Sequence, residues 1–327
     1  MKAIGIILAG GNNNRMKELT AKRAVPALPV AGSFRSIDFA LSSMSNSHIQ
    51  TVAVLTQYNA RSLNEHLSSS KWWNFGRKQG GLFLFTPTVT ADNSDWYRGT
   101  ADAMYQNIDF LKRRHEPYVI ISSGDCVYKL DFNRVLDFHI EKKSDITVVC
   151  KDMMYNDDVS RFGVVRMDDE SRITEFDEKP IEALSNTIST GIYVIRRRQL
   201  IELLEAAAEE NRFDFVNDIL VRYKNVKKIY GYKINSYWNN IADIDAYFKT
   251  NMDFLRPDIR SYFFREEPTI CSKVDDLPPA KFNPGSDISN SLVSSGCIIN
   301  GSVEDSVLFK QVFVGKNTTV KNCVILN

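Results

Sequence analysis

Residues 8–15, with the sequence LAGGNNNR, have the composition of a phosphate-binding turn. An apolar run leads into Gly10 and Gly11, and Arg15 follows shortly after them. Glycines allow backbone N–H groups to approach phosphate oxygens, and a guanidinium adds a forked cationic donor. The segment is neither GxGxxG nor a GxxxxGK loop, which argues against a dinucleotide-binding or P-loop site. Because asparagine tolerates positive φ, the turn can persist without more glycines, although an ordinary strand-to-helix turn has the same pattern.

Residues 96–107, WYRGTADAMYQN, predict a second part of a nucleotide site. Aromatic residues precede Gly99 and Thr100, and a helix is expected to begin there with Asp102 in its first turn. A helix N-terminus offers unpaired N–H groups to an anion. A surface helix capped by Thr100 is the alternative interpretation.

Two further stretches place charged side chains at expected strand ends. Asp125, in SSGDCVY at 122–128, directly follows an apolar run, where a carboxylate can hold Mg²⁺ against a phosphate. Residues 161–180 predict a hairpin that ends in Glu178 and Lys179, before a proline. The lysine could hold a sugar phosphate, and the glutamate could accept hydrogen bonds from sugar hydroxyls. A turn aspartate and a surface Glu–Lys pair are the plainer interpretations.

Apolar strand-like runs alternate with amphipathic helical stretches from residue 1 to about 255. The near-continuous Val and Ile of the runs favour a mostly parallel sheet covered on both faces, and the alternation favours a doubly wound α/β domain. Ligands of such sheets bind beyond the carboxyl ends of the strands, so residues 8–11 and 122–125 are expected to form the floor of one pocket. The expected strands are 3–9, 51–57, 118–125, 144–150 and 189–195, and the expected helices are 35–47, 101–115 and 197–211.

The pattern of the sequence changes after about residue 280, from alternating strand-like and helical segments to short repeats. The segments ISNSLV (288–293), VEDSVL (303–308) and VKNCVI (320–325) repeat one short pattern, which predicts coils of a parallel β-helix. We therefore expect a nucleotidyltransferase-like α/β domain at 1–255, a linker at 256–285 and a β-helix domain at 286–327. An uncapped last coil would expose an apolar end, so the β-helix is expected either to be incomplete or to dock on a partner.

Composition narrows the function classes. A formal charge of +1 gives no electrostatic case for nucleic acid or an acidic membrane surface as a partner. The five cysteines are scattered and form no CxxC pair, which is typical of reduced thiols in a cytoplasmic protein. The first apolar run is too short to span a membrane and leads straight into the glycine turn, so we expect no signal peptide.

Taken together and in order, these stretches resemble the sugar-nucleotide pyrophosphorylases, and among them the glucose-1-phosphate adenylyltransferase (ADP-glucose pyrophosphorylase) family. The resemblance implies the nucleotide-diphospho-sugar transferase fold with a left-handed β-helix, Mg²⁺ as cofactor, and an oligomer. It also implies a reaction of ATP with glucose 1-phosphate that gives ADP-glucose and pyrophosphate. It rests on LAGG with Arg15, on 23–42 (RAVPALPVAGSFRSIDFALS), on 96–107, on GDCVY, on FGVV with DEKP, on STGIYVI, and on 237–255 (YWNNIADIDAYFKTNMDFL).

The resemblance also assigns roles to individual residues. Gly10, Gly11 and Arg15 would face the triphosphate, and Asp125 would bind Mg²⁺. The base and ribose would be bound by Gln57, Gly99, Thr100 and Asp102, and glucose 1-phosphate by Glu178, Lys179, Ser189, Asp214 and Trp238.

The chain departs from the family pattern at positions close to the chemistry. Val25 replaces a lysine that neutralises phosphates, and Asn240 replaces the second magnesium carboxylate. The other departures are Asn13 and Asn14 in the glycine turn, Val216 and Asn217 after Asp214, and Cys126 after Asp125. Loss of one preorganised charged group typically lowers turnover by about 10²–10³. The resemblance therefore implies a regulatory, D-type subunit of glycogen biosynthesis that is a poor catalyst alone and assembles with a catalytic subunit.

Other functions fit part of the pattern. The chain could be a fully active pyrophosphorylase that uses Lys22 or Arg23 in place of the lost lysine and a water in place of the lost carboxylate. It could also be a non-enzymatic sugar-phosphate sensor. A thymidylyl- or guanylyltransferase is disfavoured by residues 96–107.

Overall fold

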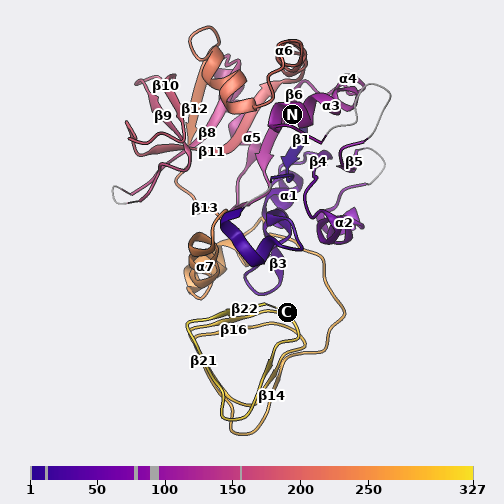
Figure 1. The fold of residues 1–327 in the computed structure, drawn as a ribbon, viewed down its shortest axis with the longest axis vertical. Coiled ribbons are helices and arrows are strands. Elements are labelled where there is room, and N and C mark those ends of the chain that lie inside the picture. The colour runs from indigo at the N-terminus through magenta and orange to yellow at the C-terminus, as the bar shows by residue number, and fades with distance from the viewer. Residues whose placement is uncertain (1, 12–13, 77–79, 89–95, 155–156, 327) are drawn as a thin grey trace.

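The computed structural model describes residues 2–11, 14–76, 80–88, 96–154 and 157–326. Figure 1 shows an α/β domain above a narrow triangular stack of short strands near the C-terminus. The prediction at Asn13 falls outside the described residues.

One large mixed sheet forms the α/β domain. Its strands run in the order β10-β9-β11-β6-β1-β4-β5, and β8 pairs with β11 and β12. Pairing is parallel from β5 to β6 and between β8 and β12, whereas β11 is antiparallel to each of its partners. The predicted hairpin at 161–180 is present as β9 and β10. The strands are β1 Ala3–Leu8, β4 Thr51–Leu55, β5 Gly81–Phe85, β6 Tyr118–Ser123, β8 Ile146–Asp152, β9 Gly163–Met167, β10 Ile173–Glu178, β11 Thr187–Arg196 and β12 Ile229–Lys233.

Helices cover both faces of this sheet, as the doubly wound pattern predicts. Along β1, Ala3 and Ile7 pack into one apolar cluster with α1, α2 and α5, while Ile4 and Ile6 pack into another with α3, α4 and α6. This division follows from the alternation of side chains along a strand. The helices are α1 Ser36–Asn46, α2 Arg61–Leu67, α3 Thr100–Gln106, α4 Ile108–Lys112, α5 Phe132–Glu141 and α6 Arg197–Glu209.

The prediction of a single helix at 101–115 is wrong. The chain forms α3 and α4 with a break at Asn107, whose φ of −109° and ψ of 22° are not helical. The Asn107 side chain donates hydrogen bonds to the carbonyl of Ala103 (2.8 Å) and to the hydroxyl of Tyr97 (2.9 Å). Asparagine competes in this way with the backbone hydrogen bonds of a helix.

The segment expected as a linker, 256–285, carries structure of its own. Helix α8 (Pro257–Phe264) follows α7 (Ile244–Asp253), and Phe263 is fully buried in an aromatic cluster with Phe39 and Phe254. Strand β14 (Lys281–Phe282) already belongs to the stack of short strands.

The three predicted repeats form a β-helix. Three parallel sheets, β14-β17-β20, β15-β18-β21 and β16-β19-β22, make its sides, and its core includes Ile299, Val303 and Leu308. One side packs on the α/β domain, where Phe309 meets Leu255 beyond the end of α7. The strands are β15 Asp287–Ser289, β16 Leu292–Val293, β17 Ile298–Ile299, β18 Ser302–Glu304, β19 Val307–Leu308, β20 Phe313–Val314, β21 Thr319–Lys321 and β22 Val324–Ile325.

A hairpin of β2 (Pro29–Val30) and β3 (Phe34–Arg35) lies between the two domains. The carbonyl of Gly32 accepts a hydrogen bond from Ser294 of the β-helix (2.7 Å), and the amide of Ala31 donates to Asn251 of α7 (3.0 Å). Within the described ranges, no helix is both long and apolar enough to cross a membrane.

Candidate active site

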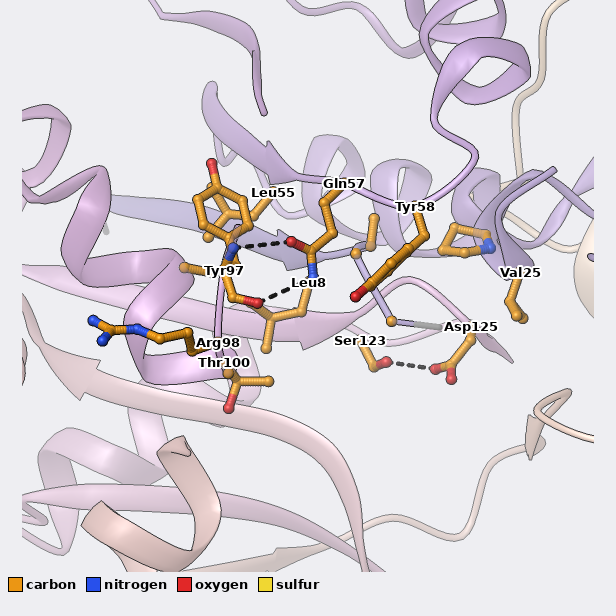
Figure 2. Close-up of a pocket in the computed structure, with 16 residues that line it drawn as sticks. Leu8, Val25, Leu55, Gln57, Tyr58, Tyr97, Arg98, Thr100, Ser123 and Asp125 are labelled. Atoms are coloured by element: carbon orange, nitrogen blue, oxygen red, sulfur yellow. Dashed lines mark hydrogen bonds between the residues drawn. The ribbon is translucent and has the colours of Figure 1, made fainter. Parts of the chain in front are cut away.

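A cavity of about 490 Å³ opens at the carboxyl ends of β1, β4 and β6. Predicted residues from remote parts of the chain meet in it, and Figure 2 shows Gln57 and Tyr97 on one side and Ser123, Asp125 and Val25 on the other. This is the edge of the sheet at which the sequence predicts a pocket. The described residues that line it are Leu8, Ala9, Gly10, Gly11, Val25, Pro26, Leu55, Gln57, Tyr58, Tyr97, Arg98, Gly99, Thr100, Ala103, Ser123 and Asp125.

Gln57 is fixed by the segment opposite it. Its Oε1 accepts a hydrogen bond from the amide of Tyr97 (3.0 Å), and its Nε2 donates to the carbonyl of the same residue (3.2 Å; Figure 2). Next to it, Tyr58 stacks on Trp96 with ring centroids 5.5 Å apart, and both rings are partly exposed. Sequence reasoning missed Tyr58, whose only signal was its place after Gln57. An exposed stacked pair at a cavity offers an apolar face for a planar base.

Two amides in the first turn of α3 are already paired within the protein, whereas the sequence analysis expected unpaired N–H groups there. The carbonyl of Phe213 accepts hydrogen bonds from the amides of Ala101 (2.8 Å) and Asp102 (3.2 Å). A Cβ atom at Gly99 would lie 2.3 Å from this oxygen, so only glycine permits the approach. Thr100 Oγ1 accepts from the amide of Phe215 (2.8 Å).

Asp102 is buried, and its carboxylate binds groups at the start of α3 and within this helix. It accepts hydrogen bonds from the amide of Arg98 (2.8 Å) and from Nε2 of Gln106 (3.0 Å). It is absent from the described lining of the cavity. The structure therefore gives Asp102 a role in holding the start of α3, and its role at the base and ribose stays a prediction.

Asp125 and Asn240 are brought together by a two-stranded sheet of β7 (Cys126–Tyr128) and β13 (Trp238–Asn240). Asn240 lies opposite Cys126, and the amide of Ile241 donates to the carbonyl of Asp125 (2.9 Å). Burial, together with the Asp125 carboxylate, raises the pKa of the Cys126 thiol well above its ordinary value. A raised pKa favours the protonated thiol, the form that is the weaker nucleophile.

The donor set at this point does not match a two-carboxylate magnesium site. Asp125 supplies one carboxylate, whose Oδ1 accepts a hydrogen bond from Ser123. The Oδ1 of Asn240 accepts from the amide of Ala242 (2.9 Å), and its Nδ2 points to the Cys126 sulfur (3.4 Å). Across the described residues, no group of three or more His, Cys, Asp or Glu could hold a metal ion. Mg²⁺ prefers carboxylate oxygens, so the residues present fit it poorly.

Val25 forms part of the cavity wall and carries no charge there. It is 4% exposed and packs in an apolar cluster with Met16, Val127 and Ile241. Arg15 is exposed and is not among the described lining residues. Burial chiefly lowers the pKa of the Arg161 guanidinium, Asp158 raises it, and the charge of Arg15 lowers it.

Three of the predicted sugar-phosphate residues gather around Tyr193, which sequence reasoning missed. The hydroxyl of Ser189 lies 3.3 Å from that of Tyr193. Burial raises the pKa of Tyr193, and the nearby carboxylates of Glu178 and Asp214 raise it further. Asp214 Oδ2 lies 3.5 Å from Thr100 Oγ1, which connects this group to the cavity.

The other two predicted sugar-phosphate residues lie beside this group. Lys179 is exposed, and its Nζ lies 3.1 Å from Glu178. Trp238 is buried against Phe162, with ring centroids 5.6 Å apart, and its Nε1 has no hydrogen-bond partner in the described part of the chain. The amide of Lys179 donates to the Phe162 carbonyl (3.1 Å). None of the five predicted sugar-phosphate residues is a described lining residue of the cavity.

Comparisons with known proteins cover almost the whole chain. Residues 4–256 match the nucleotidyl transferase family, and residues 278–327 match the GlmU-like C-terminal hexapeptide family, in agreement with a left-handed β-helix. A glucose-1-phosphate adenylyltransferase of Clostridium novyi is 38% identical over 97% of this chain and 84% of its own length. Those of Pseudothermotoga lettingae and Geobacillus stearothermophilus are 39% and 36% identical over 98% of this chain, and over 76% and 83% of their own lengths.

The contact between Gly99 and Phe213 gives a test of the site's construction. Gly99→Ala should destabilise the protein by about 1–3 kcal/mol, because the new methyl group forces the Phe213 carbonyl away from α3. Gly11→Ala is the matched control, since no atom of the described residues lies within 4 Å of its added Cβ. Urea unfolding monitored by fluorescence measures both. Equal urea midpoints for the two variants would show that the close contact between Gly99 and Phe213 does not stabilise the protein.

Proposed function

The chain belongs to the glucose-1-phosphate adenylyltransferase family, and we propose that it is a regulatory, D-type subunit of that enzyme. In this proposal it acts in the cytoplasm in glycogen biosynthesis and assembles with a catalytic subunit that makes ADP-glucose from ATP and glucose 1-phosphate. The observation that carries the proposal is the contrast within one site. A cavity is present at the predicted edge of the sheet, whereas Val25 and Asn240 occupy the two positions where the family resemblance implies a lysine and a carboxylate.

The reaction explains why these two positions matter. Glucose 1-phosphate attacks the α-phosphorus of ATP in line, and the enzyme contributes mainly position and neutralisation of charge. Position is available here, because Gly10, Gly11 and Gln57 line a preformed cavity. Neutralisation is weakened, because Val25 offers no charge and Asn240 only a neutral amide. Each such loss typically lowers turnover by about 10²–10³, and two losses need not multiply.

The alternative of a fully active enzyme lacks support in this cavity. Lys22 and Arg23, the cations closest in sequence to Val25, are not among the described residues that line it. Burial lowers the pKa of Arg35 and raises that of Tyr247, and the charge of Arg23 also acts on both groups by lowering their pKa values. The absence of Lys22 and Arg23 from the described lining favours the regulatory proposal, and Arg98, which does line the cavity, is already paired with Asp102 (3.3 Å).

Assembly with a catalytic subunit tests the proposal directly. The chain alone should make ADP-glucose at a rate at least about 10²-fold below that of a catalytic subunit from the same source. Co-expressed with that subunit, it should copurify as a hetero-oligomer and alter the KM or the effector response of the complex. The measurements are light scattering and initial-rate kinetics. Turnover by the chain alone at the rate of the catalytic subunit would exclude the regulatory role, and an unchanged complex would favour a separate sensor.

Binding of a sugar phosphate should persist without turnover. Glu178, Lys179, Ser189 and Asp214 are all present near Tyr193, so millimolar glucose 1-phosphate should raise the Tm by binding the native state. Lys179→Ala should remove most of the shift. Lys316→Ala, which removes an exposed lysine of the β-helix, should leave it intact. Differential scanning calorimetry provides the readout, and absence of a shift in the parent protein would mean that this group binds no sugar phosphate.

Restoring the two substituted groups should restore chemistry. Val25→Lys brings a cation to the cavity wall, and Asn240→Asp sets a second carboxylate beside Asp125, which is the donor type that Mg²⁺ prefers. The double variant should make ADP-glucose at least about 10²-fold faster than the parent, with a more than additive gain.

Two controls isolate the cause of that gain. Val25→Met introduces a long unbranched side chain, as Val25→Lys does, but without a charge. Asn240→Ser offers an uncharged oxygen where Asn240→Asp offers a carboxylate. Neither control should raise turnover. If the double variant folds and binds ATP but gains nothing, then Val25 and Asn240 do not cause the loss of activity.

A further inference from the structure

A second cavity, of about 390 Å³, lies at the opposite edge of the sheet. It opens where β1, β4, β5 and β6 begin, whereas the cavity of the candidate active site lies where β1, β4 and β6 end. In Figure 1 this edge carries the N-terminus and faces away from the β-helix. Its described lining is Lys2, Ala3, His48, Gln50, Thr51, Gly80, Arg113, Arg114, His115 and Glu116.

The lining carries a local excess of positive charge. Lys2, Arg113 and Arg114 face a single carboxylate, that of Glu116, although the whole chain has a formal charge of only +1. Asp109 lies 3.9 Å from Arg113, but both side chains are largely exposed, so this pair neutralises little. Cations gathered in a concave surface raise the local concentration of anions.

The carboxylate of Glu116 is already engaged by the protein. Its Oε1 accepts a hydrogen bond from the buried hydroxyl of Thr51 (3.2 Å), and its Oε2 accepts from the amide of His115 (3.1 Å). The three cations of the cavity have no such hydrogen bond to Glu116 in the described contacts. Glu116 therefore offsets only part of the positive charge, and the described lining keeps an excess of cations.

The loop that carries the arginines is held in place from behind. Arg197 of α6 donates hydrogen bonds to the carbonyls of Glu116 (2.9 Å) and Leu111 (3.0 Å), on either side of the arginines. The guanidinium of Arg114 lies 4.8 Å from the ring centroids of both Phe83 and Phe110. Cation–π contacts of this kind restrict the side chain and leave its N–H edge open to a planar or tetrahedral oxyanion.

We propose that this cavity binds a small phosphate-bearing anion at a site separate from the candidate active site. Two arginines and a lysine around a concave surface match the several oxygens of a phosphoryl group, to which guanidinium groups bind in a forked manner. Strands β1, β4 and β6, which begin at this site, end shortly before Gly10, Gln57 and Asp125, so the two cavities share one sheet.

Titration with inorganic pyrophosphate by isothermal calorimetry at low ionic strength tests the proposal. Lys2→Gln combined with Arg113→Gln removes two exposed cations of the cavity and should weaken binding about tenfold or more, the loss expected for charge-assisted hydrogen bonds. Arg134→Gln combined with Lys316→Gln is the matched control, since it removes the same charge from exposed positions elsewhere. Added salt should weaken binding to the parent protein.

Arg15→Gln separates this proposal from the proposed function, because it alters only the expected triphosphate site. Pyrophosphate binding that Arg15→Gln leaves intact and the double variant at Lys2 and Arg113 weakens would support the new site. The proposal is overturned if the parent protein binds no pyrophosphate, or if the double variant binds it as tightly as the parent and the control. Loss on Arg15→Gln alone would place the anion at the candidate active site instead.

Discussion

The backbone carbonyl of Phe213 is the contact on which the candidate site depends. It accepts two hydrogen bonds from the first turn of α3 and presses against Gly99, which lies far from it in sequence. A buried amide without a partner costs about 1–3 kcal/mol, so this one oxygen satisfies two groups that would otherwise oppose burial of the helix start. The same oxygen also takes the two amides of Ala101 and Asp102 that could otherwise have bound an anion.

This contact joins the two halves of the site. The segment after Phe213 continues to Asp214 and Phe215, which contact Thr100 and Tyr193. The cavity wall at Thr100 and the group of side chains around Tyr193 are thus joined by hydrogen bonds to Thr100 and by the ring contact of Phe215 with Tyr193. A ligand that moves Thr100 must move Asp214 with it, because packed and hydrogen-bonded contacts transmit small displacements. The break between α3 and α4 also helps to hold the cavity wall. The side chain of Asn107, the residue at the break, donates a hydrogen bond to the hydroxyl of Tyr97, which lines the cavity.

The sequence predicts those parts of the molecule that depend on local periodicity. Val and Ile runs gave the positions of β1, β4 and β6, so Gly10, Gln57 and Asp125 could be placed at one edge, and the three repeats gave the β-helix. It could not predict features that depend on a remote partner. The N-terminus of α3 was expected to be open because nothing near it in sequence indicates the Phe213 carbonyl. Tyr193 looked like an ordinary strand residue, and the charges that surround it come from other strands and turns.

Shape and charge depend on different atoms at this cavity. Its shape depends on hydrogen bonds to backbone groups, such as those between Phe213 and α3 and between the Gln57 side chain and Tyr97, and none of these involves the side chain at position 25 or 240. Val25 also stabilises the folded wall of the cavity. A buried aliphatic side chain contributes about 1.5–3 kcal/mol to the free energy of unfolding, here through packing with Met16, Val127 and Ile241. A lysine at the same position would have to carry its ammonium out of this cluster and into the cavity, since an unpaired charge cannot remain among apolar side chains. A valine is therefore the more stable residue for the wall, and only a need for charge in the cavity would favour a lysine there.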